Sequence, residues 1–113
     1  MTALDKLIEA VEAGTWPEDW RDVMRALTLH PDERHILARR AFSGSLDAAL
    51  ALHEALLPGR TLSVGQNAHY GDWNAWVRYA EDGEILDEYT AASDTAARSL
   101  LLAILRAYRS VQA

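Results

Sequence analysis

Apolar residues in the first half of the chain recur at every third or fourth position, which is the spacing of amphipathic helices. This pattern, together with the residues that flank each apolar run, predicts four helices. The first runs between Thr2 and Gly14, the second from Thr15 to His30, the third from Pro31 to about Phe42, and the fourth from Ser45 to Pro58. The first half of the chain is therefore expected to be entirely helical.

The second half changes to the period of two that β-strands show. Strands are predicted at about 61–64, 73–80 and 84–89, and Asp82-Gly83 between the last two is a strong hairpin signal because both positions accept a positive φ. Ser93 or Asp94 is then expected to cap a final helix that runs to about Ser110. The order is helices, an antiparallel meander and one long helix.

The second strand suggests how these elements stack. One face of it carries Trp73, Ala75, Val77 and Tyr79, while the other carries Trp76, and Leu86 follows on the next strand. A sheet with apolar residues on both faces needs cover on both. The sequence predicts an α+β fold in which N-terminal helices and a long C-terminal helix enclose a three-stranded antiparallel β-meander, an α/β/α layered sandwich. A single domain is expected over 1–113, with helices at about 3–57, the sheet at about 60–90 and the last helix at about 93–110.

Composition narrows the classes of protein. The chain has 113 residues, half of them hydrophobic, no cysteine and a net charge of −6. The absence of cysteine excludes a disulfide scaffold and a thiolate zinc site, and the acidic balance disfavours binding to nucleic acid. The sequence shows neither a signal peptide nor an apolar run long enough for a bilayer, so we expect a cytoplasmic protein without membrane contact.

One histidine stands among leucines in the fourth helix. The stretch "SLDAALALHEALLPG", residues 45–59, is apolar on nearly all sides, which is typical of a buried helix. We therefore expect His53 to be a neutral core residue with one hydrogen-bond partner. A catalytic role would need a carboxylate, metal ligand or nucleophile within reach, and the sequence supplies none.

Three stretches resemble one known family. The helix "GSLDAALALHEALLPG" (44–59), the ending "AASDTAARSLLLAILRAYRS" (91–110) and the opening "ALDKLIEAVEAGTW" (3–16) are similar to the phage alpha-beta-alpha sandwich domain family of small bacteriophage and prophage proteins. The resemblance implies helix–sheet–helix layering and brings no established activity and no catalytic residues. The chain departs from the family at Arg60-Thr61, where members place a tryptophan at the start of the strand.

Catalytic and metal-binding patterns are not found in the sequence. His30 and His35 do not share a helix face, and His53-Glu54 lacks the second histidine of a zincin motif. The chain has no nucleophile elbow and no glycine-rich phosphate loop. We expect no catalytic residue, no metal ligand, no cofactor and no enzymatic activity.

Two groups of residues are candidates for binding. Arg34, Arg39 and Arg40 form a basic patch, interpreted as a solvated face that pairs with nearby acids. The better candidate is the loop between the first two strands and the strand after it. Its polar and aromatic residues suit a binding surface: Gln66, Asn67, His69, Tyr70, Asp72 and Trp76. The alternative is that the tryptophans of this region pack in the core and the loop only connects two strands.

The leading hypothesis is a small, non-enzymatic phage or prophage accessory protein in the cytoplasm of a bacterial host. It would bind a host or phage macromolecule, and we expect this partner to be a protein. An inhibitor of host defence is one form of this hypothesis. Two alternatives stay open. One is a small-ligand-binding protein or minor hydrolase with a pocket between sheet and helix. The other is a structural component that self-associates, for which a homodimer is the simplest form.

Overall fold

The structure is a computed structural model that describes residues 2–27, 33–67 and 71–112. Within these ranges five helices and three strands follow one another. They are α1 (Ala3–Glu12), α2 (Trp20–Ala26), α3 (Glu33–Phe42), α4 (Leu46–Leu56), β1 (Thr61–Gln66), β2 (Trp73–Glu81), β3 (Glu84–Ser93) and α5 (Ala96–Gln112). The fold class is the predicted one: N-terminal helices, an antiparallel meander of order β1-β2-β3 and a long C-terminal helix.

Helix α5 is the centre of the molecule. It packs against all three strands on one side and against α1, α3 and α4 on the other. Its apolar residues from Ala97 to Tyr108 are therefore buried, as expected for a helix enclosed by other elements, whereas Val111 near its end is exposed. The largest fully buried side chains of α5 are Leu100, Leu101, Ile104 and Leu105.

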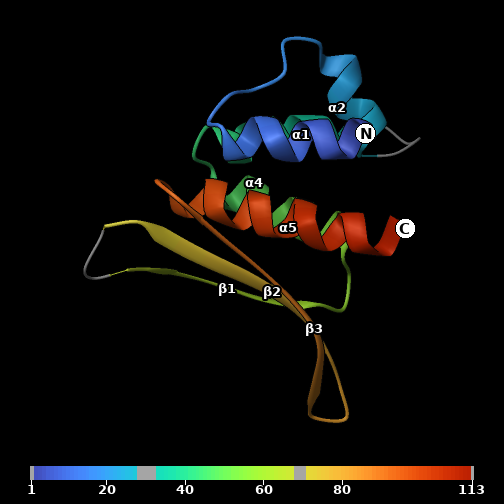
Figure 1. The fold of residues 1–113 in the computed structure, drawn as a ribbon, viewed down its shortest axis with the longest axis vertical. Coiled ribbons are helices and arrows are strands. Elements are labelled where there is room, and N and C mark those ends of the chain that lie inside the picture. The colour runs from blue at the N-terminus through green and yellow to red at the C-terminus, as the bar shows by residue number, and fades with distance from the viewer. Residues whose placement is uncertain (1, 28–32, 68–70, 113) are drawn as a thin grey trace.

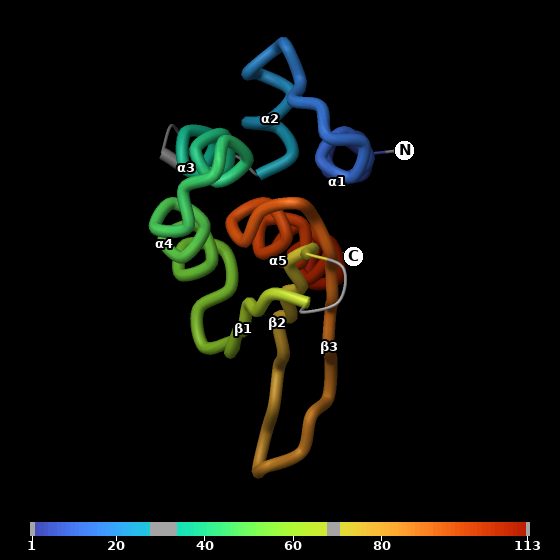
Figure 2. The backbone as a smooth tube through the Cα atoms, turned by 90° about the vertical axis from the view of Figure 1, so that its left-hand side faces the viewer, coloured from blue at the N-terminus to red at the C-terminus, as the bar shows by residue number. Residues whose placement is uncertain are grey.

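The layers are stacked differently from the predicted sandwich. All described helices lie on the same side of the sheet, with α4 and α5 next to it and α1, α2 and α3 beyond them (Figures 1 and 2). The expectation of helices on both faces rested on Trp76 and Leu86. The Trp76 ring is instead covered by the Arg78 guanidinium, 3.7 Å from the ring centroid, and Leu86 stays exposed. A side chain of the sheet itself thus shields one of the two apolar residues for which a second helix layer was expected.

The start of the second helix is also corrected. Thr15 does not open α2; its backbone N–H donates to the Ala10 carbonyl at 2.9 Å and so closes the end of α1. The N-cap of α2 is Asp19, whose carboxylate accepts a hydrogen bond from the Arg21 N–H at 2.9 Å. Residues 15–18 therefore form a connection that places Trp16 beside α3. The predicted break at His30-Pro31 lies outside the described residues.

The remaining turns and caps mostly follow the sequence signals. Ser45 caps α4 as predicted, and its hydroxyl accepts from the Ala48 N–H at 3.1 Å. Asp82 and Gly83 form the hairpin turn with φ values of 53° and 81°. The cap of α5 is neither Ser93 nor Asp94 but Thr95, whose hydroxyl accepts from the Arg98 N–H at 3.1 Å. β3 accordingly runs to Ser93, four residues beyond the predicted end.

Candidate functional site

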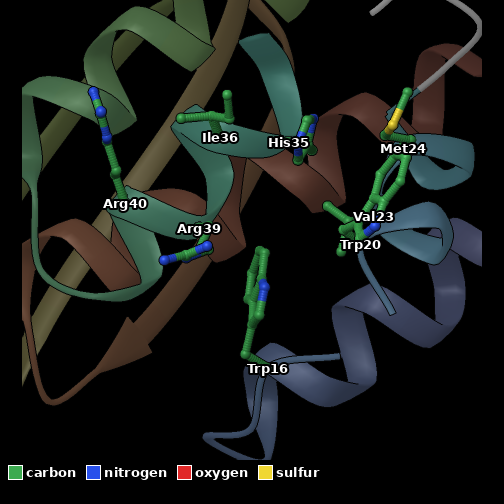
Figure 3. Close-up of a pocket in the computed structure, with 8 residues that line it drawn as sticks. All are labelled: Trp16, Trp20, Val23, Met24, His35, Ile36, Arg39 and Arg40. Atoms are coloured by element: carbon green, nitrogen blue, oxygen red, sulfur yellow. The ribbon is translucent and has the colours of Figure 1, made fainter. Parts of the chain in front are cut away.

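A groove between α2 and α3 encloses a cavity with a volume of about 620 Å³. This volume lies within the range of about 300–1,000 Å³ that is usual for ligand pockets. Its walls come from α2, from α3 and from the connection that precedes α2 (Figure 3). The eight lining residues are Trp16, Trp20, Val23, Met24, His35, Ile36, Arg39 and Arg40. We refer to this cavity as the α2–α3 groove.

The apolar wall of the groove remains open to solvent. Trp20 is the first residue of α2 and is 54% exposed, and Ile36 on α3 is 42% exposed. The Trp20 and His35 rings lie with their centroids 5.8 Å apart across the two helices. Large apolar side chains that stay exposed together beside a concavity are typical of a binding surface.

The charged residues that the structure describes in the groove are both basic. Arg39 and Arg40 lie in the last turn of α3, where the helix dipole favours cations. Both are exposed, neither forms an ion pair within the described part of the chain, and none of the lining residues is acidic. Arg40 is directed away from the two tryptophans, so it lies at the rim (Figure 3). The groove is thus a local concentration of positive charge on a chain whose net charge is −6.

One buried polar atom of a groove residue has no hydrogen-bond partner among the described residues. The Nδ1 atom of His35 is buried and makes no hydrogen bond to any described residue. Buried polar atoms are normally hydrogen-bonded, and an exception calls for an explanation. His35 lines the groove with other atoms of its ring, because Nδ1 itself has almost no exposed surface.

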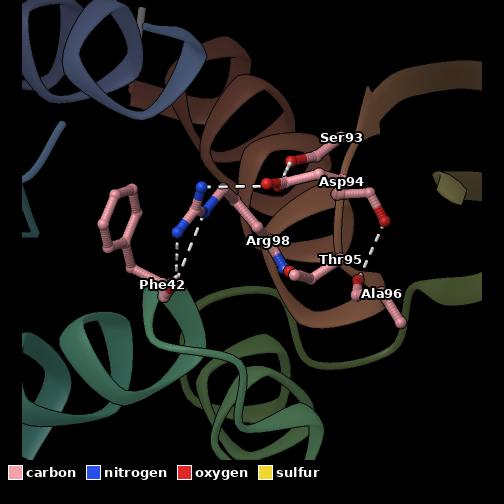
Figure 4. A network of polar contacts seen from close by, with 7 residues as sticks. Phe42, Ser93, Asp94, Thr95, Ala96 and Arg98 are labelled. Carbon is pink, nitrogen blue, oxygen red and sulfur yellow. Dashed lines mark hydrogen bonds and ion pairs between the residues drawn. The ribbon is translucent and has the colours of Figure 1, made fainter. Parts of the chain in front are cut away.

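Two other arginines hold the walls of the groove in place. The Arg34 guanidinium donates to the Leu27 carbonyl at 3.3 Å and to the Ala55 carbonyl at 3.4 Å, which joins the ends of α2 and α4 through α3. Arg98 on α5 donates to the Phe42 carbonyl at 3.0 and 3.3 Å (Figure 4). Arg34 therefore has a structural role, whereas Arg39 and Arg40 lie in the groove. From the sequence, all three were expected in one basic patch.

Arg98 also connects α5 to the aromatic wall. Its guanidinium lies 4.0 Å from the centroid of the Phe42 ring, and this ring in turn lies 5.1 Å from the Trp16 ring. The third guanidinium nitrogen of Arg98, Nη1, forms an ion pair with Asp94 at 3.4 Å (Figure 4). The position of Trp16 in the groove is thus fixed by a chain of contacts that begins on the central helix.

The two described ends of the loop predicted as a binding surface are hydrogen-bonded to each other. The Asn67 N–H donates to the Asp72 carbonyl at 2.7 Å, and the Gln66 side chain donates to the Gly71 carbonyl at 3.4 Å. His69 and Tyr70 lie outside the described residues. Trp76 pairs with Ser63 and so lies on the opposite face of the sheet from Gln66. Gln66 and Trp76 therefore do not form one surface, and a binding role for this region stays a prediction.

His53 is a core residue, as predicted. It is 2% exposed, and burial, with a smaller contribution from Arg60, lowers its pKa, while Glu54 opposes the shift. Its Nε2 atom has no hydrogen-bond partner among the described residues, in contrast to the expected single partner. The lowered pKa keeps the imidazole neutral, which is the form that burial tolerates.

Comparisons with protein-family models, with curated proteins and with solved structures find no match. Membership of the phage family therefore stays a prediction. No group of three or more potential metal ligands occurs among residues 2–27, 33–67 and 71–112. Within the same ranges no helix has the length and apolar character to cross a membrane.

The groove was not predicted from the sequence. No binding role was predicted for Trp20, Val23 or Met24, and Arg39 and Arg40 were interpreted as part of a solvated face. One feature of the sequence could have indicated the groove. The helix α3 is rich in charged residues but contains Ile36 and Leu37 side by side, and a narrow buried face can hold only one of these two large side chains.

Proposed function

We propose that the protein is a non-catalytic binding protein and that the α2–α3 groove is its recognition surface. The observation that carries the proposal is the exposed pair Trp20 and Ile36 beside two arginines that no described acid neutralises. Tryptophan and arginine are the residue types most enriched at the energetic centres of protein interfaces.

The chemistry of the groove defines the partner. Apolar side chains of the partner fill the cavity against Trp16, Trp20 and Ile36, and acidic groups meet Arg39 and Arg40. An acidic, partly apolar segment of a protein satisfies both requirements. In a phage or prophage protein, which the sequence resembles, such a segment would belong to a host or phage protein, and occupation of it would be a means to inhibit host defence.

An anionic aromatic probe tests the groove without knowledge of the partner. Anilinonaphthalene sulfonate (ANS) combines fused aromatic rings with one negative charge and becomes fluorescent on apolar surfaces. We expect the folded protein to bind it saturably, and the charge-reversing variant Arg39→Glu/Arg40→Glu to bind it at least tenfold more weakly. A near-ultraviolet circular dichroism spectrum identical to that of the unmodified chain confirms that the variant is folded.

The matched control is Lys6→Glu/Arg25→Glu. It makes the same change in net charge with two exposed residues that line a separate cavity of about 150 Å³ beside α1 and α2. This control should retain the ANS affinity of the unmodified chain. Equal losses in both variants would show a general effect of net charge and would contradict the assignment of the site to the groove.

A further inference from the structure

The hairpin between β2 and β3 extends beyond the rest of the sheet. Pairing between β1 and β2 ends at Thr61 and Arg78, so residues 79–87 form a two-stranded ribbon without a third strand. We call residues 79–87 the hairpin tip. It projects from the sheet away from the helices (Figures 1 and 2). Tyr79 at the base of the ribbon is covered by the Arg60 guanidinium, 5.1 Å from the ring centroid. A ribbon of two strands gains little stability of its own, and no packing against a described residue explains the exposed Ile85 and Leu86.

The hairpin tip is both apolar and acidic. Tyr79, Ile85 and Leu86 are exposed, the last two by 51% and 49%. The tip also carries four exposed acids and no basic residue; the acids are Glu81, Asp82, Glu84 and Asp87. Exposed apolar side chains that are clustered on a projecting element mark an interaction surface.

A β-bulge determines how the apolar residues are presented. Ala80 pairs with Ile85 and Tyr79 pairs with Asp87, which leaves Leu86 as an extra residue in β3. A bulge of this kind interrupts the alternation of side chains and redirects those beside it. It therefore gives two consecutive apolar residues, Ile85 and Leu86, that are both exposed at the tip.

We infer that the hairpin tip of one copy docks in the α2–α3 groove of a second copy. This inference rests on the proposed function, because the tip has the acidic and apolar chemistry that the groove is proposed to recognise. Ile85 and Leu86 enter the cavity beside Trp20 and Ile36, and the acids of the tip meet Arg39 and Arg40. Charge complementarity of this kind sets both the partner and its orientation.

The placement of the two surfaces makes the contact intermolecular. The tip lies at one end of the longest dimension of the molecule and α2 at the other (Figures 1 and 2). When the groove of one copy binds the hairpin tip of the next copy, the two copies form a head-to-tail interface. Such an interface produces open chains of copies, unless the rotation between neighbouring copies closes a ring. A hairpin tip in a groove is a small contact, in the class below about 1,200 Å² that is usual for weak and transient complexes.

Sedimentation velocity over a range of concentrations tests the inference. The full chain is compared with a groove variant, Arg39→Glu/Arg40→Glu, and a tip variant, Ile85→Asp/Leu86→Asp. Circular dichroism and thermal unfolding confirm that both are folded. We expect the mean mass of the unmodified chain to rise with concentration past that of a dimer, while each variant alone stays monomeric.

An equimolar mixture of the two variants separates a head-to-tail contact from other kinds of self-association. The groove variant has an intact tip and the tip variant an intact groove, so only one productive interface can form between them. The mixture should give a one-to-one dimer and no larger species, and raised salt should dissociate it.

Three results would overturn the inference: a monomeric unmodified chain at every concentration, a dimer that the groove variant does not abolish, or a mixture that stays monomeric. ANS binding distinguishes the two proposals. Groove-dependent ANS binding by a chain that remains monomeric leaves the recognition surface in place and removes only its self-docking. A monomeric chain that also fails to bind ANS would contradict both the recognition surface and the self-docking.

Discussion

The four tryptophans of the chain fall into two pairs with different surroundings. Trp73 and Trp76 are half-buried on β2, and Trp76 is covered by Arg78, which is itself bonded to Glu88 at 2.6 Å. Trp16 and Trp20 line the α2–α3 groove, where no described acid neutralises the neighbouring arginines of α3. Each pair of tryptophans has arginines nearby. Of these arginines, only that of the sheet, Arg78, also has an acidic partner, Glu88, among the described residues.

This difference separates a structural cation from one available for recognition. An arginine that stacks on a tryptophan and pairs with a glutamate has used both its apolar face and its charge within the fold. Arg39 and Arg40 retain their charge, and Trp20 retains half of its surface. Exposed tryptophan and unneutralised arginine together therefore identify a binding surface better than aromatic content alone.

The largest effect on stability is expected from Arg98, which supports the groove from behind. We expect Arg98→Ala to lower the free energy of unfolding by about 1.5–3 kcal/mol, since its guanidinium makes charged hydrogen bonds to the Phe42 carbonyl. Urea denaturation measures the change. Arg109→Ala is the matched control on the same helix: its ion pair with Asp5 lies at the surface, so its loss should cost clearly less stability than the loss of Arg98. Equal effects of the two variants would contradict the supporting role of Arg98.

The next effect compares one tryptophan from each pair. Trp76→Ala should lower the free energy of unfolding by about 1–2 kcal/mol, because the cation–π contact with Arg78 and the cross-strand contacts are lost. Trp20→Ala should lower it by no more than about 0.5 kcal/mol, as expected for an exposed position. Only the Trp20 variant should lose ANS binding. A larger loss of stability in the Trp20 variant, or a loss of ANS binding in the Trp76 variant, would show that the two pairs had been assigned the wrong roles.

A smaller effect distinguishes the core histidine from the groove histidine. The pKa of His53 is lowered by burial from an ordinary value of 6.5, so the unfolded chain binds a proton at a pH where the folded chain does not. The stability that His53 contributes is therefore present above about pH 6.5 and declines as the pH falls, by at most about 1.4 kcal/mol per pH unit.

His53→Leu should remove this decline and leave stability near neutral pH unchanged or raised, because an unpartnered buried nitrogen is replaced by an apolar group. Urea denaturation at about pH 7 and about pH 5 provides the comparison. If the variant and the unmodified chain lost the same stability on acidification, titration of His53 would not be the cause. His35→Leu serves as the counterpart in the groove, where ANS affinity should change.

The smallest effect on stability is expected from the arginines of the groove. Arg39→Ala should change the free energy of unfolding by less than about 0.5 kcal/mol, because the side chain is exposed and makes no ion pair with a described residue. A loss above about 1 kcal/mol would indicate a structural role that a recognition residue should not have.

The elements of the fold were predictable because their signals are local. The Ser45 cap and the Asp82-Gly83 turn depend only on neighbouring residues and are present as predicted. The stacking of the layers was not predictable, since whether Trp76 meets a helix or the Arg78 of its own strand depends on packing over a long range. The groove was missed for the same reason: Trp16 and Ile36 meet only when α3 docks on α5 through Arg98 and Phe42.

The most direct test follows the indole N–H signals of the four tryptophans by nuclear magnetic resonance while ANS is added, with the signals assigned from single Trp→Phe variants. Our account predicts that the signals of Trp16 and Trp20 shift in proportion to occupancy while those of Trp73 and Trp76 stay in place. Shifts confined to Trp73 and Trp76 would contradict it and would return the binding surface to the sheet.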